Sequence, residues 1–185
     1  MPTKGQILTN PTTGDIYEYV ETAKDTNGER VTMKATIKTK EPLVPNHIHV
    51  TQDETFEVVS GKLTIWLDGN EETLSAGGKV TLPKLKPHNH YNHGDDAVTY
   101  LHTVTPALDF DYFMENLIGL AADGKTKNGK HSLVQQLVFL KYLDSKFYLA
   151  DVPVGAQKAL MNLIAPIGRL FGYRAIYKKY SEIEK

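Results

Sequence analysis

Short segments in which apolar and polar residues alternate follow one another through the first 105 residues of the chain. Alternation with period two is typical of strands that bury one face. Turn residues such as Asn27-Gly28 and Gly94-Asp95 separate the segments. The pattern predicts strands at residues 15–22, 31–39, 46–50, 56–59, 63–67, 79–82 and 98–104. Many short strands with regular turns indicate an all-β barrel or sandwich.

After Pro106 the spacing of the apolar residues lengthens to that of a helix. A first helix is predicted from about residue 108 to Gly124, followed by a polar loop at 124–130. A second is predicted at 133–143, with Ser132 as its N-cap, and a third at 154–171, which Pro166 should kink or split. We therefore expect a β-barrel over residues 1–105 and a helical extension over 106–185 that packs on it.

Two histidines two residues apart, His47 and His49, carry the clearest chemical signal of the chain. On a strand they point to the same face and can bind one ion. Glu54 lies an odd number of residues further on, so a turn or bulge must intervene before it can face the same way. With His88 from a later strand, the set predicts a nitrogen and oxygen site for a divalent transition metal. Glu57, the rival carboxylate, should face solvent.

The order and spacing of these residues resemble the two conserved motifs of the cupin superfamily, over about residues 30–105. The first motif is matched by His47, His49, Glu54 and Gly61, while Glu41 occupies the place of its leading glycine. The second is matched by Gly77, Pro83, His88 and Asn92, while Leu85 occupies the place of its inner glycine. Both departures fall at turn positions and not at ligand positions. The helical tail resembles that of bacterial cupins of unassigned function.

The resemblance implies a double-stranded β-helix, or jelly-roll, barrel that holds one divalent transition metal (Fe, Mn, Ni, Cu or Zn). Three histidines and one glutamate leave an octahedral ion with two free positions. This favours a dioxygenase-like enzyme acting on a small molecule. A metal-dependent isomerase and a non-catalytic cupin that binds or senses a small ligand are the alternatives, because a fold alone does not decide function.

Several other residues are expected to lie near these ligands and to line or support the site. His90 shares a face with His88 and is the candidate acid–base residue. The aromatic strand residues are either barrel core or walls of an apolar pocket, and they are Phe56, Trp66, Tyr91 and Tyr100. Asn92 should hold a turn. His93 and His102 are expected to be structural and His131 to lie on the surface.

Composition narrows the functional classes. The net charge of −1 gives no basic field for nucleic acid, and the absence of cysteine excludes disulfides, thiolate ligands and a cysteine nucleophile. Without a signal peptide or a membrane-spanning apolar run, we expect a soluble cytoplasmic protein with a small-molecule partner. Residues 158–185 carry a net charge of +4, and packing on the barrel is favoured over lying on a membrane. The helices would then shield the metal or form a homodimer contact.

Overall fold

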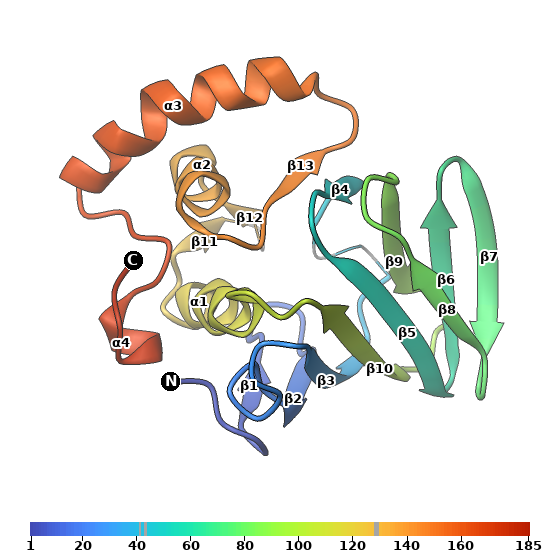
Figure 1. Cartoon of the computed structure of the whole chain (residues 1–185). Helices are drawn as coiled ribbons and strands as arrows, with labels where there is room; N and C mark the ends of the chain where they lie inside the picture. Colours follow the sequence, from blue (N-terminus) through green and yellow to red (C-terminus); the bar gives the residue numbers. More distant parts are fainter. Residues whose placement is uncertain (41, 43, 128–129) are drawn as a thin grey trace.

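The computed structural model describes residues 1–40, 42, 44–127 and 130–185, and it contains the predicted barrel (Figure 1). The strands of the first sheet are β1 (Ile7–Thr9), β2 (Ile16–Glu21), β3 (Val31–Ile37), β10 (Val98–Thr105), β5 (Asp53–Ser60) and β8 (Lys79–Leu82), in that spatial order. Those of the second are β13 (Phe147–Leu149), β4 (His47–His49), β9 (His88–Asn92), β6 (Lys62–Leu67) and β7 (Asn70–Ser75). Neighbouring strands pair antiparallel, as in a jelly-roll barrel, so the predicted fold class is confirmed.

The three predicted helices are present as α1 (Phe110–Ala122), α2 (Leu133–Tyr142) and α3 (Val154–Leu170), and a short α4 (Lys178–Ser181) follows. The Ser132 hydroxyl accepts a hydrogen bond from the backbone N–H of Gln135, as expected of an N-cap. Pro166 was expected to kink or split the third helix, and it does not split it, because α3 continues through it. Pro166 faces solvent, where water can satisfy the carbonyl group that its ring leaves unpaired.

Some elements were not predicted from the pattern. Strands β1 and β7 are short or mostly exposed, so they lack the alternation of a half-buried strand. The predicted polar loop at 124–130 contains a small hairpin of β11 (Thr126–Lys127) and β12 (Lys130–His131). Residues 128 and 129 of that loop lie outside the described residues. Strand β13 was also missed, since three residues give too little periodicity to recognise.

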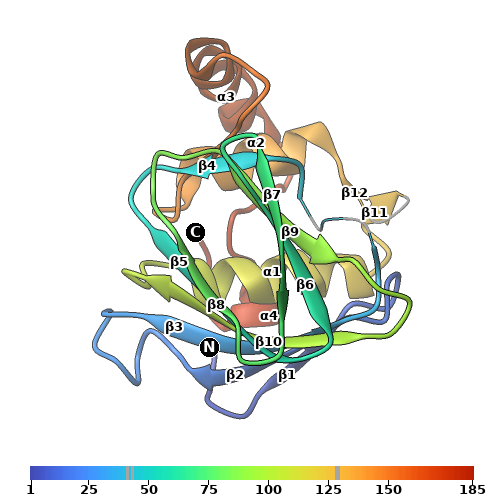
Figure 2. The same ribbon diagram turned by 90° about the vertical axis from the view of Figure 1, so that its right-hand side faces the viewer.

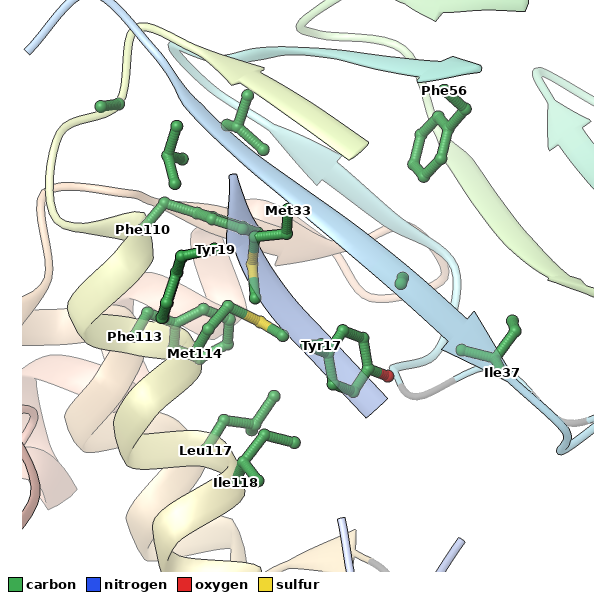
Figure 3. Packing of buried hydrophobic residues seen from close by; sticks show 14 of the residues in the cluster. Tyr17, Tyr19, Met33, Ile37, Phe56, Phe110, Phe113, Met114, Leu117 and Ile118 are labelled. Atoms are coloured by element: carbon green, nitrogen blue, oxygen red, sulfur yellow. The ribbon is translucent and has the colours of Figure 1, made fainter. Parts of the chain in front are cut away.

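Helix α1 lies across one end of the barrel, where it closes the space between the two sheets (Figures 1 and 2). Its buried face packs against Tyr17, Tyr19 and Met33 of the first sheet in a single core (Figure 3). The Tyr19 hydroxyl donates to the backbone carbonyl of Asp111 at 2.6 Å, so a polar bond also joins the helix to the sheet. Burial of this apolar face contributes most of what holds the helix in place.

The chain beyond residue 105 also completes the second sheet. Strand β13 pairs with β4, and the register aligns Phe147 with His49 and Leu149 with His47. The two expected parts, 1–105 and 106–185, thus share a sheet, and a segment of the extension lies directly beside the histidine pair. Among the described residues no helix is both long and apolar enough to span a membrane.

Candidate metal centre

The four predicted ligands come together inside the barrel. His47 and His49 project inward from β4, while Ile48 between them is less buried, as strand alternation requires. His88 stands opposite His47 on β9. Residues 50–52 interrupt the strand before Glu54 on β5, so the expected change of parity is present. One ligand atom from each residue lies within 4.8 Å of all the others.

The rings of His47 and His88 are held so that one nitrogen of each is available to an ion. Nδ1 of His47 lies 2.9 Å from the carbonyl oxygen of Pro45, and Nδ1 of His88 lies 2.8 Å from that of Lys86. A carbonyl oxygen can only accept, so each Nδ1 carries the hydrogen and each Nε2 keeps its lone pair. This fixing of the tautomer by a backbone partner is common in histidines that bind metals.

The contact between Glu54 and His88 tests whether these residues fit a metal. Glu54 Oε2 and His88 Nε2 are 3.0 Å apart and buried, and with the hydrogen of a neutral His88 ring on Nδ1 neither atom makes a hydrogen bond. Buried polar atoms without a partner are costly. A cation between the rings and the carboxylate would satisfy both atoms at once. The donor set of imidazole nitrogens and a carboxylate therefore fits a divalent transition metal.

The electrostatics of the cluster lower the pKa values of Glu54, His47 and His49 and raise that of His88. Burial lowers the pKa of His47 to about 3, so its ring is neutral at pH 7. Burial alone would raise the pKa of Glu54, but His49, His102 and His88 together hold it well below its ordinary value. Burial alone would also lower the pKa of His88, but the neighbouring Glu54 carboxylate raises it above its ordinary value. The free cluster thus places an ionised carboxylate beside the neutral ring of His47, and a metal that binds there would displace any proton held by His88.

A family model for the cupin domain matches residues 28–104 of the chain. Residues 28–104 are a cupin domain. The second of the two departures from the cupin motifs, Leu85, is exposed and adopts the left-handed backbone conformation (φ 66°) that glycine normally takes. Its backbone N–H donates to the carbonyl oxygen of His49, so the turn beside the ligands keeps its shape. Glu41 lies outside the described residues.

Solved structures of other proteins are similar to the chain at low identity. They include KdgF from Halomonas sp., with 18% identity, coverage of 50% of this chain and 79% of that one, and a TM-score of 0.44. A predicted oxalate decarboxylase from Thermotoga maritima has 14% identity, coverage of 56% and 92%, and a TM-score of 0.48. A sugar phosphate isomerase of the cupin superfamily from Silicibacter pomeroyi has 20% identity, coverage of 50% and 59%, and a TM-score of 0.44. No curated protein matches the chain.

His102 contacts the cluster of the cupin domain, although it was expected only to be structural. Its Nε2 lies 3.0 Å from Glu54 Oε1, and its ring stacks on Phe56 at 4.5 Å between centroids. The pairing of β10 with β5 places His102 opposite Phe56 and brings it to this face. Sequence motifs do not record this register. His102 therefore supports the carboxylate. It lies two residues from the predicted pocket residue Tyr100 on the same strand, and this shared face could have identified it from the sequence.

A cavity of about 60 Å³ adjoins the ligands within the barrel. His90 and Tyr100 line it, as expected of pocket residues, and His90 Nε2 lies 3.0 Å from the Tyr100 hydroxyl. Phe56 does not line the cavity, because it is fully buried behind the rings of His90 and His102.

Trp66 and Tyr91 also lie outside the lining of this cavity, so their assignment as pocket walls is not supported. In the register of β6 with β9, His90 pairs with Ile65, and both side chains face the interior. Their neighbours Trp66 and Tyr91 must then point to the other side of the sheet.

Several lining residues were not predicted as pocket residues, although the helices of the extension were expected to shield the metal. They come from α1 and β13, and they are Phe110, Phe113, Met114, Leu117 and Phe147. Their helical spacing indicates a buried face, but it does not say what that face covers. The extension therefore supplies much of the apolar wall around the metal centre.

Proposed function

We propose that this protein binds one divalent transition metal (Fe, Mn, Ni, Cu or Zn) through His47, His49, Glu54 and His88 and is a small-molecule enzyme of dioxygenase type. The observation that carries the proposal is the buried, unpaired contact of Glu54 Oε2 with His88 Nε2 inside a ring of imidazoles. A metal bound there would supply Lewis-acid or redox chemistry with open positions for an oxygen-bearing ligand.

The protein's own residues would position the metal and keep it dry. Pro45 and Lys86 carbonyls fix two of the imidazoles, and His102 holds the carboxylate from behind. The aromatic and aliphatic side chains of α1 cover the open end of the barrel and exclude water from the cavity. Such exclusion strengthens electrostatic interactions at the site and protects reactive species from hydrolysis.

His90 remains the candidate for proton transfer. Burial lowers the pKa of His90 to about 3, so the free ring is neutral at pH 7 and is a weak base. Its Nε2 is engaged with the Tyr100 hydroxyl, while Nδ1 is buried without a partner. Nδ1 can therefore hold a substrate hydroxyl or oxygen by a hydrogen bond, and we propose that His90 orients the substrate and relays its proton in this way.

One observation favours the non-catalytic alternative. Among the described residues, the titratable groups that line the metal cavity, apart from the predicted ligands, are Tyr17, His90, Tyr100 and His102. Burial raises the pKa values of both tyrosines well above the ordinary value of a phenol. A site with a metal but without a strong acid or base is also suited to binding or sensing a chelating ligand, whereas an isomerase would need a base.

Elemental analysis of the purified protein tests the metal site. We expect about one equivalent of a transition metal in the wild type and its loss in the His47→Ala/His49→Ala variant. His93→Ala is the matched control, because His93 is an exposed histidine outside the cluster. Full metal content in the double variant would refute the proposed ligands. Oxygenated small molecules bound anaerobically to the protein with its resident metal, and then exposed to dioxygen, test for activity. Binding without turnover or oxygen uptake would favour the binding protein.

We also propose that the chain forms a homodimer through the outer face of α3. Leu163, Leu170 and Phe171 on this face are 67%, 86% and 79% exposed. A lipid surface fits less well, since Lys158 and Arg169 lie over the rings of Tyr148 and Tyr142 instead of flanking the apolar face. Light scattering should give the dimer mass for the wild type and the monomer mass for Leu163→Glu, and a monomeric wild type would refute the assembly.

A further inference from the structure

A second and larger cavity lies between the barrel and the helices of the extension. Its volume is about 330 Å³, which is within the range of sites for small molecules. Helices α1 and α2, strand β13 and the segment before β4 form its walls. The apolar lining includes Ile118, Ala121, Phe139, Leu140 and Leu149. No part of the metal cluster lines it, so it is a separate compartment of the same molecule.

The two cavities are neighbours. Four side chains line both of them, and they are Val44, Phe113, Leu117 and Phe147. The cavity at the metal cluster, with about 60 Å³, has room for only a few water-sized groups. These four side chains form the common wall, so the second cavity is the adjoining space for the part of a substrate that is larger than a chelating head group.

The lining of the second cavity restricts the chemistry of what enters it. Apolar side chains dominate the wall, and polar ones are confined to Asn10, Lys130, His131 and Gln136. Nδ1 of His131 is buried without a hydrogen-bond partner, so it can accept or donate one bond to a ligand. No carboxylate belongs to the lining among the residues described. Lys130 is the one permanent charge there, and it disfavours a cationic group.

From this arrangement we infer that the substrate is an elongated molecule with an oxygen-chelating head and an apolar alkyl or aromatic body. The head binds at the metal cluster, and this part of the inference rests on the proposed function. The body occupies the second cavity. Its far end is neutral or anionic. His131, expected to be a surface residue, is a half-buried wall of this compartment and contacts Phe139 edge to face.

Straight-chain alkyl hydroxamic acids from two to eight carbons test this inference, because they combine a constant chelating head with a growing tail. Their affinities for the full chain loaded with Ni²⁺ can be measured by calorimetry. Each methylene buried in the cavity should tighten binding about fourfold. The gain should continue over several methylenes in the wild type. Affinity that does not change with chain length would overturn the inference.

Filling the cavity should remove this dependence without altering the head group. Ala121→Phe places a ring in the second cavity but not at the metal cluster, and Leu140→Phe is a second variant should the first not fold. Ala122→Phe is the matched control, since Ala122 is the next residue of α1 and is exposed. Acetohydroxamate should bind all folded variants with the same affinity. Octanohydroxamate should bind more tightly than acetohydroxamate to the wild type and Ala122→Phe, and most of this difference in affinity should be lost in Ala121→Phe and Leu140→Phe. Equal binding of octanohydroxamate to Ala121→Phe and Ala122→Phe would overturn the inference.

Failure of the proposed metal site can be distinguished from failure of the inference about the second cavity. If the protein takes up no metal and acetohydroxamate does not bind, the proposed function fails. Octanoate, which needs no metal, then probes the cavity by itself. Its binding should be weakened in Ala121→Phe and unchanged in Ala122→Phe. Absence of that difference would refute the apolar compartment as a ligand site.

Discussion

Asp109 joins three distant segments of the extension, and its replacement by alanine is a sharp test of how the extension supports the metal site. Its carboxylate accepts hydrogen bonds from the backbone N–H groups of Asp144, at 3.0 and 2.9 Å, and of Ser145, at 2.8 Å. It also lies 2.9 Å from Nζ of Lys185 at the end of the described chain. Residues 144 and 145 lead directly into β13, the neighbour of the strand that carries His47.

The cost of Asp109→Ala follows from these contacts. Hydrogen bonds from two backbone N–H groups, a buried one of Ser145 and a part-buried one of Asp144, to a charged acceptor contribute together about 3 kcal/mol. The contact with Lys185 adds less than about 1 kcal/mol, because the Lys185 side chain is 36% exposed and water screens it. For a chain of this length, the loss should lower the melting temperature by about 6–12 °C. Lys185→Met, which removes only the exposed partner, should change it little.

The pH dependence of this effect has a definite sign. Burial alone would raise the pKa of Asp109, but the N–H groups of Asp144 and Ser145 and the Lys185 ammonium outweigh it and lower the pKa below its usual value. A depressed pKa contributes stability above about pH 4, and that stability is lost as pH falls through the folded value. The difference between wild type and Asp109→Ala should therefore be full at pH 7 and shrink below pH 4.

Thermal and urea unfolding at pH 7 and pH 3 measure this difference, and a metal titration measures the consequence for the site. Loss of the tether should also weaken metal binding in Asp109→Ala more than in Lys185→Met, since β13 would hold β4 less firmly. If Asp109→Ala lowers the melting temperature by less than about 2 °C, the change is far smaller than the lost bonds require, and the reasoning is refuted.

Three further perturbations have defined outcomes. Leu85→Gly should raise the free energy of unfolding by about 0.5–1 kcal/mol in a urea titration, because the φ of 66° strains a leucine; unchanged stability would contradict this. In chelator competition, His102→Phe should weaken metal binding about 10–100-fold and Glu54→Gln more than that, and the reverse order would contradict the assigned roles. Truncation after Thr105 should give a barrel that aggregates in light scattering, because the face under α1 becomes exposed; a truncated barrel as heat-resistant as the full chain would count against it.

The strands and the common face of His47, His49 and Glu54 could be predicted from the sequence, because both depend on local information. The jelly-roll fold and the place of His88, which lies opposite His47 on a distant strand, followed from the resemblance to the cupin motifs. Period-two alternation places His47 and His49 on one face regardless of what surrounds the strand. The odd spacing to Glu54 predicts the interruption that the structure contains at residues 50–52. Each of these two inferences uses only a few neighbouring residues, so it holds even when the rest of the fold is unknown.

Features that depend on pairing between distant segments could not be predicted in the same way. The contact of His102 with Glu54 exists because β10 and β5 pair in one particular register. A shift of that register by one residue would turn His102 to the opposite face of the sheet. Trp66 illustrates the converse, since its aromatic character suggested a pocket, while alternation with the inward-facing Ile65 places it on the outer side.

The surroundings of the metal cluster are the part of the site that was predicted least well from the sequence. The reason is that the extension, and not the cupin domain, supplies much of the cavity wall. Phe110 and Phe113 belong to α1, and Phe147 to β13, yet all three line the cavity beside the predicted ligands. The Asp109 tether and the β13–β4 pairing hold these walls against the strand that carries the histidines. Changes in the extension could therefore alter the substrate while the ligand motif stays intact. For this reason the identity of the substrate is to be sought in the helices that close the barrel and not in the metal-binding residues.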